Sequence, residues 1–254
     1  MGFRTVVVAG AVLILGACSS GGTSRSSATT ETSKTGATAS TTTPAAGATP
    51  DYAVGVRTET FENASRALTA KDGDPPPGPR VLETTIYYPA RGTGGGVPTD
   101  DPPIANGGPF PLIVFAHGFS ASPSVYAGLT AEWARAGYVV AVPRFPGSNA
   151  AAVGGPDAGD YVNQPADVHT VISGMTEMSR QPGGPLAGLV RAGAVGVAGH
   201  SLGGITTLGA AANTCCRDRR IGAAVVLSGD PLSFPTGKFD YAKTPPLLLV
   251  HGTA

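Results

Sequence analysis

Apolar and polar positions change their period several times along the chain from about residue 51 onward. Segments 54–61 and 81–88 alternate apolar with polar residues and are rich in β-branched and aromatic side chains, which predicts two strands. Continuous apolar runs, typical of strands covered on both faces of a sheet, follow at 111–116, 138–142, 194–198, 221–227 and 246–250.

Helical periods lie between these apolar runs. Residues three and four positions apart predict helices over 122–136 and 165–178, and small residues predict a third helix from Ser201 to about Asn213. Segments rich in Gly and Pro are predicted loops, at 71–79, 91–109 and 144–164. Alternating strands and helices favour an α/β fold, with a mostly parallel central sheet flanked by helices, over residues 51–254.

The motif Gly199-His200-Ser201-Leu202-Gly203 follows one apolar run and precedes the small-residue helix. Glycines on both sides of a serine suit a sharp strand-to-helix turn, where side chains would clash with the neighbouring strand and helix. The helix N-terminus directs the Leu202 N–H and a positive dipole end to the same point, where an oxyanion could form. The pattern favours Ser201 as a nucleophile, the alternative being a serine in a structural turn.

A second motif, His117-Gly118-Phe119-Ser120, follows the apolar run 111–116. The carboxyl ends of parallel strands meet at one edge of the sheet, where ligands bind. This loop could therefore supply a second oxyanion donor, the N–H of Phe119. We expect His117 to brace the loop.

Three segments together resemble a known fold family. FAHGFSAS, VAGHSLGG and LLLVHG, each following a predicted strand, resemble the α/β-hydrolase fold. VGVRTETFENASR and VLETTIYYPA are similar to the group of platelet-activating-factor acetylhydrolases, dienelactone hydrolases, chlorophyllases and polyester hydrolases. The resemblance implies that Ser201 is the nucleophile and that the amides of Phe119 and Leu202 form the oxyanion hole. The implied activity is that of a serine esterase that works through an acyl-enzyme.

The same resemblance implies an acid and a later histidine after the nucleophile. Only His251 follows Ser201, and the sequence ends at Ala254. We therefore expect the domain to be incomplete at its C-terminus, without its last strand and helix, and unstable or nearly inactive as it stands. Asp230 is a possible acid or a turn residue before Pro231, and no histidine is assigned as the base.

The N-terminus has the pattern of an export signal. Arg4 precedes an apolar run, 6–15, that is too short to span a bilayer. Leu15-Gly16-Ala17-Cys18 resembles the lipobox of bacterial lipoproteins, which implies a signal peptide over 1–17 and a diacylglycerol on Cys18. Residues 18–50 are rich in Ser, Thr, Ala and Gly and predict a disordered tether.

These N-terminal features predict a location in the bacterial cell envelope, on the outer side of the cytoplasmic membrane. The alternative is an ordinary signal peptide with a chance cysteine, and hence a secreted protein. In an exported protein the neighbouring Cys215 and Cys216 could bond elsewhere, stay free or form a disulfide with each other.

Composition limits the classes of ligand and partner that the protein could bind. The 17 basic and 17 acidic residues balance, so no basic surface suggests nucleic acid. The sequence has no metal-ligand spacing, and acyl transfer by a serine needs no cofactor. The expected substrate is a small or lipid-like ester. A peptidase or thioesterase, or a non-catalytic surface lipoprotein of the same fold, are the alternatives.

Overall fold

The computed structural model describes residues 50–68 and 78–252. The predicted signal peptide, Cys18 and almost all of the tether lie outside the described residues, as does most of the predicted loop 71–79. Within the described part, no helix combines the length and the apolarity needed to cross a bilayer.

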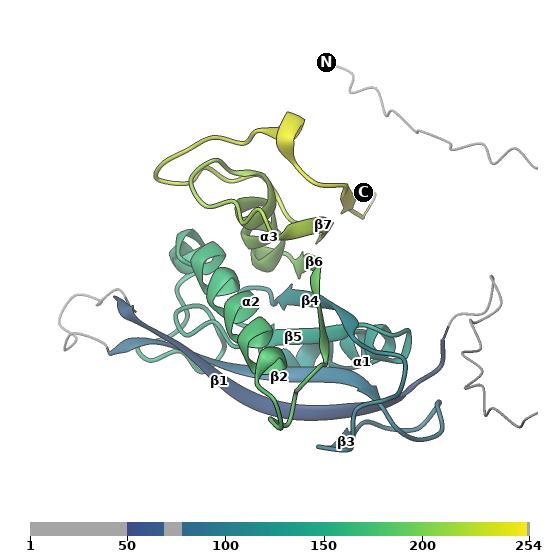
Figure 1. The fold of residues 1–254 in the computed structure, drawn as a ribbon. Coiled ribbons are helices and arrows are strands. Elements are labelled where there is room, and N and C mark those ends of the chain that lie inside the picture. The colour runs from purple at the N-terminus through teal and green to yellow at the C-terminus, as the bar shows by residue number, and fades with distance from the viewer. Residues whose placement is uncertain (1–49, 69–77, 253–254) are drawn as a thin grey trace, which may run out of the picture. The chain divides into compact units, whose positions relative to one another are not determined.

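The described residues form one sheet whose strands run in the spatial order β3-β1-β2-β5-β4-β6-β7-β8 (Figure 1). The strands are β1 Ala53–Ala67, β2 Pro79–Ala90, β3 Thr99–Asp100, β4 Phe110–Ala116, β5 Val139–Pro143, β6 Val190–His200, β7 Ile221–Leu227 and β8 Leu247–Val250. β1 pairs antiparallel with β2, and β2 with β5, whereas β5, β4, β6, β7 and β8 are parallel. The prediction of a mostly parallel sheet is confirmed.

Helices cover both faces of this sheet, as predicted. α1 (Ala127–Arg135) packs on one face, and α2 (Gln164–Arg180) and α3 (Leu202–Ala212) pack on the other (Figure 1). Short 3-10 helices interrupt the connections at η1 (Pro123–Tyr126), η2 (Ala158–Val162) and η3 (Tyr241–Lys243). The prediction that 144–164 is only a loop was wrong in one respect, because η2 forms there and the Asp157 side chain accepts a hydrogen bond from the Gly159 N–H.

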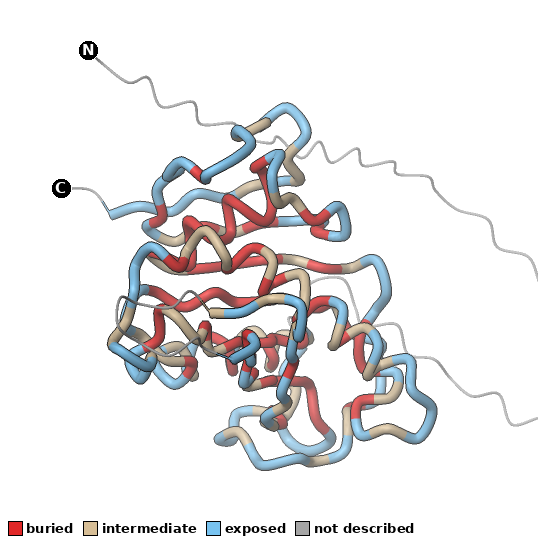
Figure 2. Tube along the Cα trace, turned by 90° about the vertical axis from the view of Figure 1, so that its left-hand side faces the viewer, coloured by how far each residue is buried: buried red, intermediate tan, exposed pale blue. Residues whose placement is uncertain are grey.

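The core has two apolar layers, one on each face of the sheet, and buried residues concentrate in the central strands and in α3 (Figure 2). Leu112 and Val114 of β4 point into the layer beneath α2 and α3, whereas Phe115 belongs to the layer beneath α1. This alternation follows from the strand period of two. Because β4 is packed on both faces, its carboxyl end is held rigidly.

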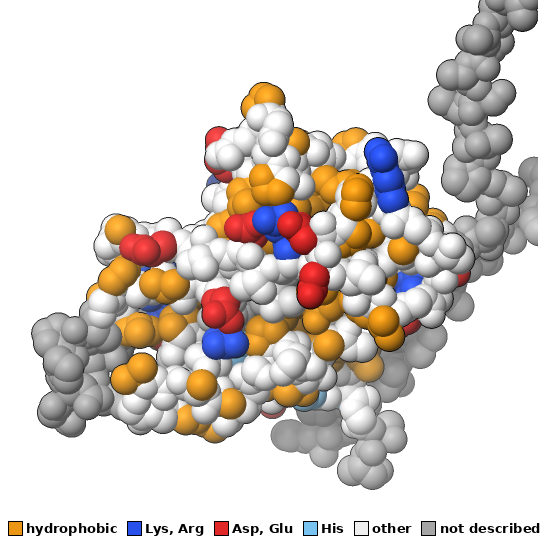
Figure 3. All heavy atoms as spheres, turned by 90° about the horizontal axis from the view of Figure 1, so that it is seen from below, with side chains coloured by type: hydrophobic (Ala, Val, Ile, Leu, Met, Phe, Trp, Pro, Cys, Tyr) orange, Lys and Arg blue, Asp and Glu red, His pale blue; other side chains and the backbone are white. Residues whose placement is uncertain are grey.

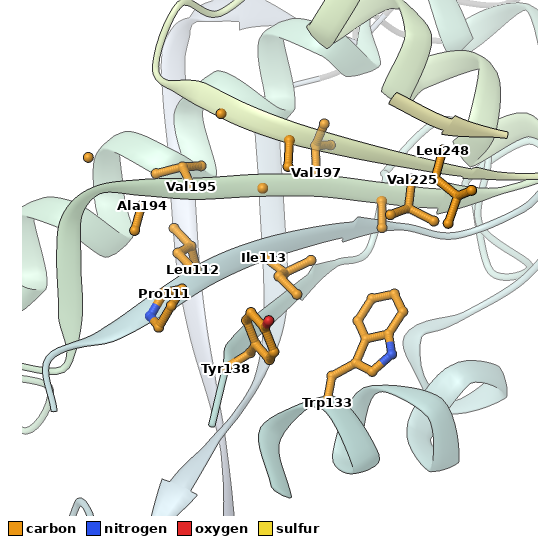
Figure 4. Close-up of a pocket in the computed structure, with 15 residues that line it drawn as sticks. Pro111, Leu112, Ile113, Trp133, Tyr138, Ala194, Val195, Val197, Val225 and Leu248 are labelled. Carbon is orange, nitrogen blue, oxygen red and sulfur yellow. The ribbon is translucent and has the colours of Figure 1, made fainter. Parts of the chain in front are cut away.

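An apolar hollow of about 630 Å³ lies on the α1 side of the sheet. Figure 4 shows the Trp133 ring of α1 facing Ile113, with Val225 and Leu248 farther along the same wall. Leu248 of the outer strand β8 is 57% exposed. Ser201, Leu202 and Phe119 do not line this hollow, so it is distinct from the predicted nucleophile site.

A buried ionic cluster ties β2 to η2 and α2. The Arg80 guanidinium, 1% exposed, forms paired hydrogen bonds with Asp160 at 2.8 Å and with Asp167 at 2.6 and 2.9 Å. Arg66 adds a bond to Asp167 from the rim. Burial alone would lower the pKa of Arg80, but the hydrogen bonds and charges of the two carboxylates raise it above its ordinary value.

Charged groups on the surface are mixed. On the face seen from below in Figure 3, acidic and basic side chains lie in small neighbouring groups among uncharged and apolar ones. This arrangement agrees with a formal net charge of zero.

Candidate active site

Ser201 stands between the end of β6 and the start of α3 with φ 54° and ψ −118°. Such angles are strained for a residue with a side chain and cost on the order of 1–3 kcal/mol. The Ser201 N–H donates to the Leu227 carbonyl at 2.9 Å, and its own carbonyl accepts from the Gly204 and Ile205 N–H groups. The strain is thus held in place by β7 on one side and by α3 on the other.

The two flanking glycines are required by close packing. A Cβ atom on Gly199 would overlap the carbonyl of Gly203, and one on Gly203 would overlap the carbonyl of Ala116 at the end of β4. The turn therefore lies directly against the neighbouring strand and against its own helix. The clash at these two positions is the one expected from the sequence motif.

Two backbone amides at this edge of the sheet are free of partners among the described residues. The N–H groups of Leu202 and Phe119 donate no hydrogen bond to any residue that the structure describes. The neighbouring loop positions are bonded, with Ser120 N–H donating to Ser148 O at 2.9 Å and Ala121 N–H to Gly118 O at 3.2 Å. Free amides in a fixed loop are what an oxyanion hole needs.

His117 braces this loop, as the sequence predicted. Its Nε2 accepts a hydrogen bond from the Phe145 N–H at 3.0 Å, and its Nδ1 lies 2.8 Å from the Gly118 carbonyl. The imidazole must therefore be neutral, with its proton on Nδ1. Burial lowers the pKa of His117, and the Arg144 charge lowers it further, against the opposing effect of the Gly118 carbonyl.

The lowered pKa predicts acid sensitivity. Because the folded state disfavours the imidazolium, His117 stabilises the fold fully above its unfolded pKa of about 6.5. This contribution is lost as the pH falls from about 6.5 through the lower folded pKa, with a slope of at most about 1.4 kcal/mol per pH unit. His117→Gln keeps one acceptor and one donor without titrating, so its unfolding free energy should fall less between pH 7 and pH 5. Urea unfolding at pH 5, 6 and 7 measures this. An equal decrease of the unfolding free energy with pH in the two proteins would contradict it.

None of the histidines forms a hydrogen bond with Ser201 within the described part of the chain. His200 bonds through Nδ1 to the Tyr126 hydroxyl at 3.0 Å, and His251 Nε2 lies 3.2 Å from the Gly229 carbonyl. His169 lies on α2, and burial lowers its pKa. Asp230 follows β7 and is exposed, and its carboxylate bonds to no described histidine.

Comparison with known proteins identifies the architecture. Residues 113–253, more than half of the chain, match the alpha/beta hydrolase family. The chain belongs to this family. A ferulic acid esterase from Streptomyces cinnamoneus has a similar structure, with a TM-score of 0.54 and 24% sequence identity. The match covers 80% of this chain and 65% of the esterase, and this likeness concerns the fold. A search of curated protein sequences found no match.

An apolar cluster that sequence analysis missed borders the turn of this alpha/beta hydrolase. Leu202 and Ile205 of α3 pack with Phe234, which comes from the segment after β7, and Tyr161 of η2 lies against the Phe234 ring. The segments meet only in the folded chain, so no local pattern could indicate them. They form an apolar wall beside the Leu202 amide.

The adjacent cysteines bond to each other in the structure. From the sequence, this pairing was one of three possibilities for the two cysteines. Cys216 packs against the same apolar cluster, at the end of α3 far along the helix from Ser201. Within the described residues, no group of three or more His, Cys, Asp or Glu side chains is arranged to hold a metal ion.

Proposed function

We propose that this alpha/beta hydrolase is a carboxylic-ester hydrolase with Ser201 as its nucleophile. The observation that carries the proposal is the strained serine at the carboxyl edge of the sheet, beside the Leu202 and Phe119 amides, which bond to none of the described residues. A strained backbone maintained by surrounding structure is typical of functional positions.

In the proposed reaction, the Ser201 Oγ attacks the ester carbonyl carbon and the carbonyl oxygen becomes an oxyanion. The amides of Phe119 and Leu202 donate hydrogen bonds to this oxyanion, which stabilises the tetrahedral intermediate. Collapse of the intermediate expels the alcohol and leaves an acyl-serine, which water then hydrolyses. A base must accept the Ser201 proton, and none of the histidines lies at that position among the described residues.

The proposed substrate is a neutral small or lipid-like ester. The wall formed by Leu202, Ile205 and Phe234 is apolar and largely buried, and the Phe119 side chain of the oxyanion loop is 46% exposed. Apolar surface of this kind suits an uncharged acyl or alcohol group. Hydrolysis of p-nitrophenyl acetate and butyrate by the purified protein tests the proposal, with matched anilides and thioesters to separate a peptidase or a thioesterase.

A second candidate is a hydrolase fold without catalysis, and one observation favours it. Each described histidine near this edge already has another partner, His117 with Phe145, His200 with Tyr126 and His251 with Gly229. A folded protein that hydrolyses none of the esters, and whose Ser201 is not labelled by a fluorophosphonate, would support this second candidate.

We also propose that Cys18 carries a lipid that anchors the protein outside the cytoplasm. The support is the Leu15-Gly16-Ala17-Cys18 sequence after a short apolar run. Cys18→Ser should move the protein from the membrane fraction to the soluble fraction or leave it unprocessed, because a stable anchor requires acyl chains. Fractionation of cells labelled with a radioactive fatty acid measures this. Unchanged membrane association and unchanged labelling of the variant would contradict it.

A further inference from the structure

One tyrosine hydroxyl joins the two loops that carry the proposed nucleophile and oxyanion donors. The Tyr126 hydroxyl accepts a hydrogen bond from the Gly118 N–H at 3.0 Å and lies 3.0 Å from Nδ1 of His200. Gly118 directly precedes Phe119, and His200 directly precedes Ser201. We propose that Tyr126 is a positioning residue that sets the Phe119 amide relative to the Ser201 hydroxyl. The inference rests on the proposed ester hydrolysis.

The Tyr126 hydroxyl can both accept and donate a hydrogen bond in this bridge. A tyrosine O–H has one proton to donate and lone pairs to accept with. Because the Gly118 N–H can only donate, the Tyr126 oxygen accepts there, and its proton is free to go to Nδ1 of His200. This direction corresponds to the His200 tautomer with its proton on Nε2. No other side-chain hydrogen bond connects these two loops within the described residues.

The tyrosine is itself held firmly, which a positioning role requires. Its ring packs on the buried Phe115 of β4, with the ring centres 4.8 Å apart, and on the His200 ring at 5.8 Å. Its carbonyl accepts a hydrogen bond from the Thr130 hydroxyl at 2.9 Å, one turn into α1. The hydroxyl is thus fixed from β4, β6 and α1 at once.

The loop of Gly118 lies close against the Tyr126 hydroxyl. A Cβ atom on Gly118 would lie 3.1 Å from the Tyr126 oxygen and 3.4 Å from Nδ1 of His200, so a side chain there would be tight against the hydroxyl. Without the hydroxyl, the Gly118 N–H loses its acceptor and the next amide, that of Phe119, loses part of its support. Removal of a whole oxyanion donor lowers kcat by about 10²–10³-fold, so a displaced donor should cost part of this.

Tyr126→Phe removes the hydroxyl and keeps the ring. We expect kcat for p-nitrophenyl butyrate to fall roughly 10-fold or more, while KM changes less than about 3-fold, because the donor acts on the transition state. Tyr88→Phe is the matched control, since it removes another tyrosine hydroxyl, one on β2 that donates to the Pro102 carbonyl at 2.8 Å and touches neither loop. Its kcat should stay within about 2-fold of the original value.

Two further measurements separate the possible outcomes. His200→Ala breaks the same bridge, so the double variant with Tyr126→Phe should lose no more than the worse single variant. Independent, multiplying losses, or an unchanged kcat in Tyr126→Phe, would overturn the positioning role. Hydrogen exchange at the Gly118 and Phe119 amides should be faster in the single variant Tyr126→Phe than in the parent protein. Unchanged exchange would contradict the hydrogen-bond bridge. A folded parent protein with no Ser201-dependent activity would instead refute the proposed function, and the positioning role of Tyr126 in it.

Discussion

Ser201→Ala is expected to remove the ester hydrolysis that the protein catalyses, down to the level of the uncatalysed reaction or slightly above it. The reason is that the acyl-enzyme cannot form without the hydroxyl, whereas the Leu202 and Phe119 amides still stabilise an oxyanion for attack by water. The measurement is kcat/KM for p-nitrophenyl acetate and butyrate by the purified protein and by the variant, at equal concentration and pH.

Ser201→Gly is the control for folding. Glycine adopts the observed φ of 54° and ψ of −118° without a Cβ clash, so this variant should be as inactive as Ser201→Ala and yet more stable than the parent by about 1 kcal/mol. Loss of activity together with gained stability would attribute the loss to the hydroxyl. Retained hydrolysis in either variant would refute Ser201 as the nucleophile.

The largest loss of stability is expected from Arg80→Met. This change leaves the carboxylates of Asp160 and Asp167 buried without the guanidinium that now bonds both, and breaking such a buried pair costs about 3–5 kcal/mol. The free energy of unfolding in urea measures the effect. The unfolding slope should stay the same, because the area exposed on unfolding does not change.

Matched variants separate the buried pair from charge in general. Arg144→Ala removes another arginine of an ion pair, with Glu83 at 2.8 Å, but both side chains there are about half exposed. Its cost should be below about 1 kcal/mol. Changing Asp160 and Asp167 to Asn in the Arg80→Met background removes the unpaired charges and should recover part of the loss. A loss below about 1 kcal/mol in Arg80→Met would contradict the stabilising role of the buried ionic cluster of Arg80, Asp160 and Asp167, called the Arg80 clamp below.

The Arg80 clamp also bears on the site. Asp160 lies in η2, and the next residue, Tyr161, packs on Phe234 of the apolar wall and donates a hydrogen bond to the Ser233 carbonyl. The clamp therefore holds one side of the proposed ester site to β2.

The sequence by itself determined the fold class and the position of the strained turn. Apolar runs, their alternation with helical spacing and the placement of Gly199 and Gly203 are short-range signals, because strand pleat, helix period and backbone sterics act between near neighbours in the chain. The same signals indicated the loop of His117 and the place of the Phe119 amide. The boundaries of strands and helices were less sharp, since neighbouring elements extend or shorten them.

Only the tertiary structure decided how the site is held and which groups lie beside it. The Tyr126–His200 bond joins residues 74 positions apart, and Arg80 reaches Asp160 and Asp167 across 80 and 87 positions. Nothing in the local sequence around any of these residues specifies its partner. Such contacts exist only after the sheet has brought β2, β4 and β6 together, because hydrogen bonds and ion pairs require groups within about 3 Å of each other.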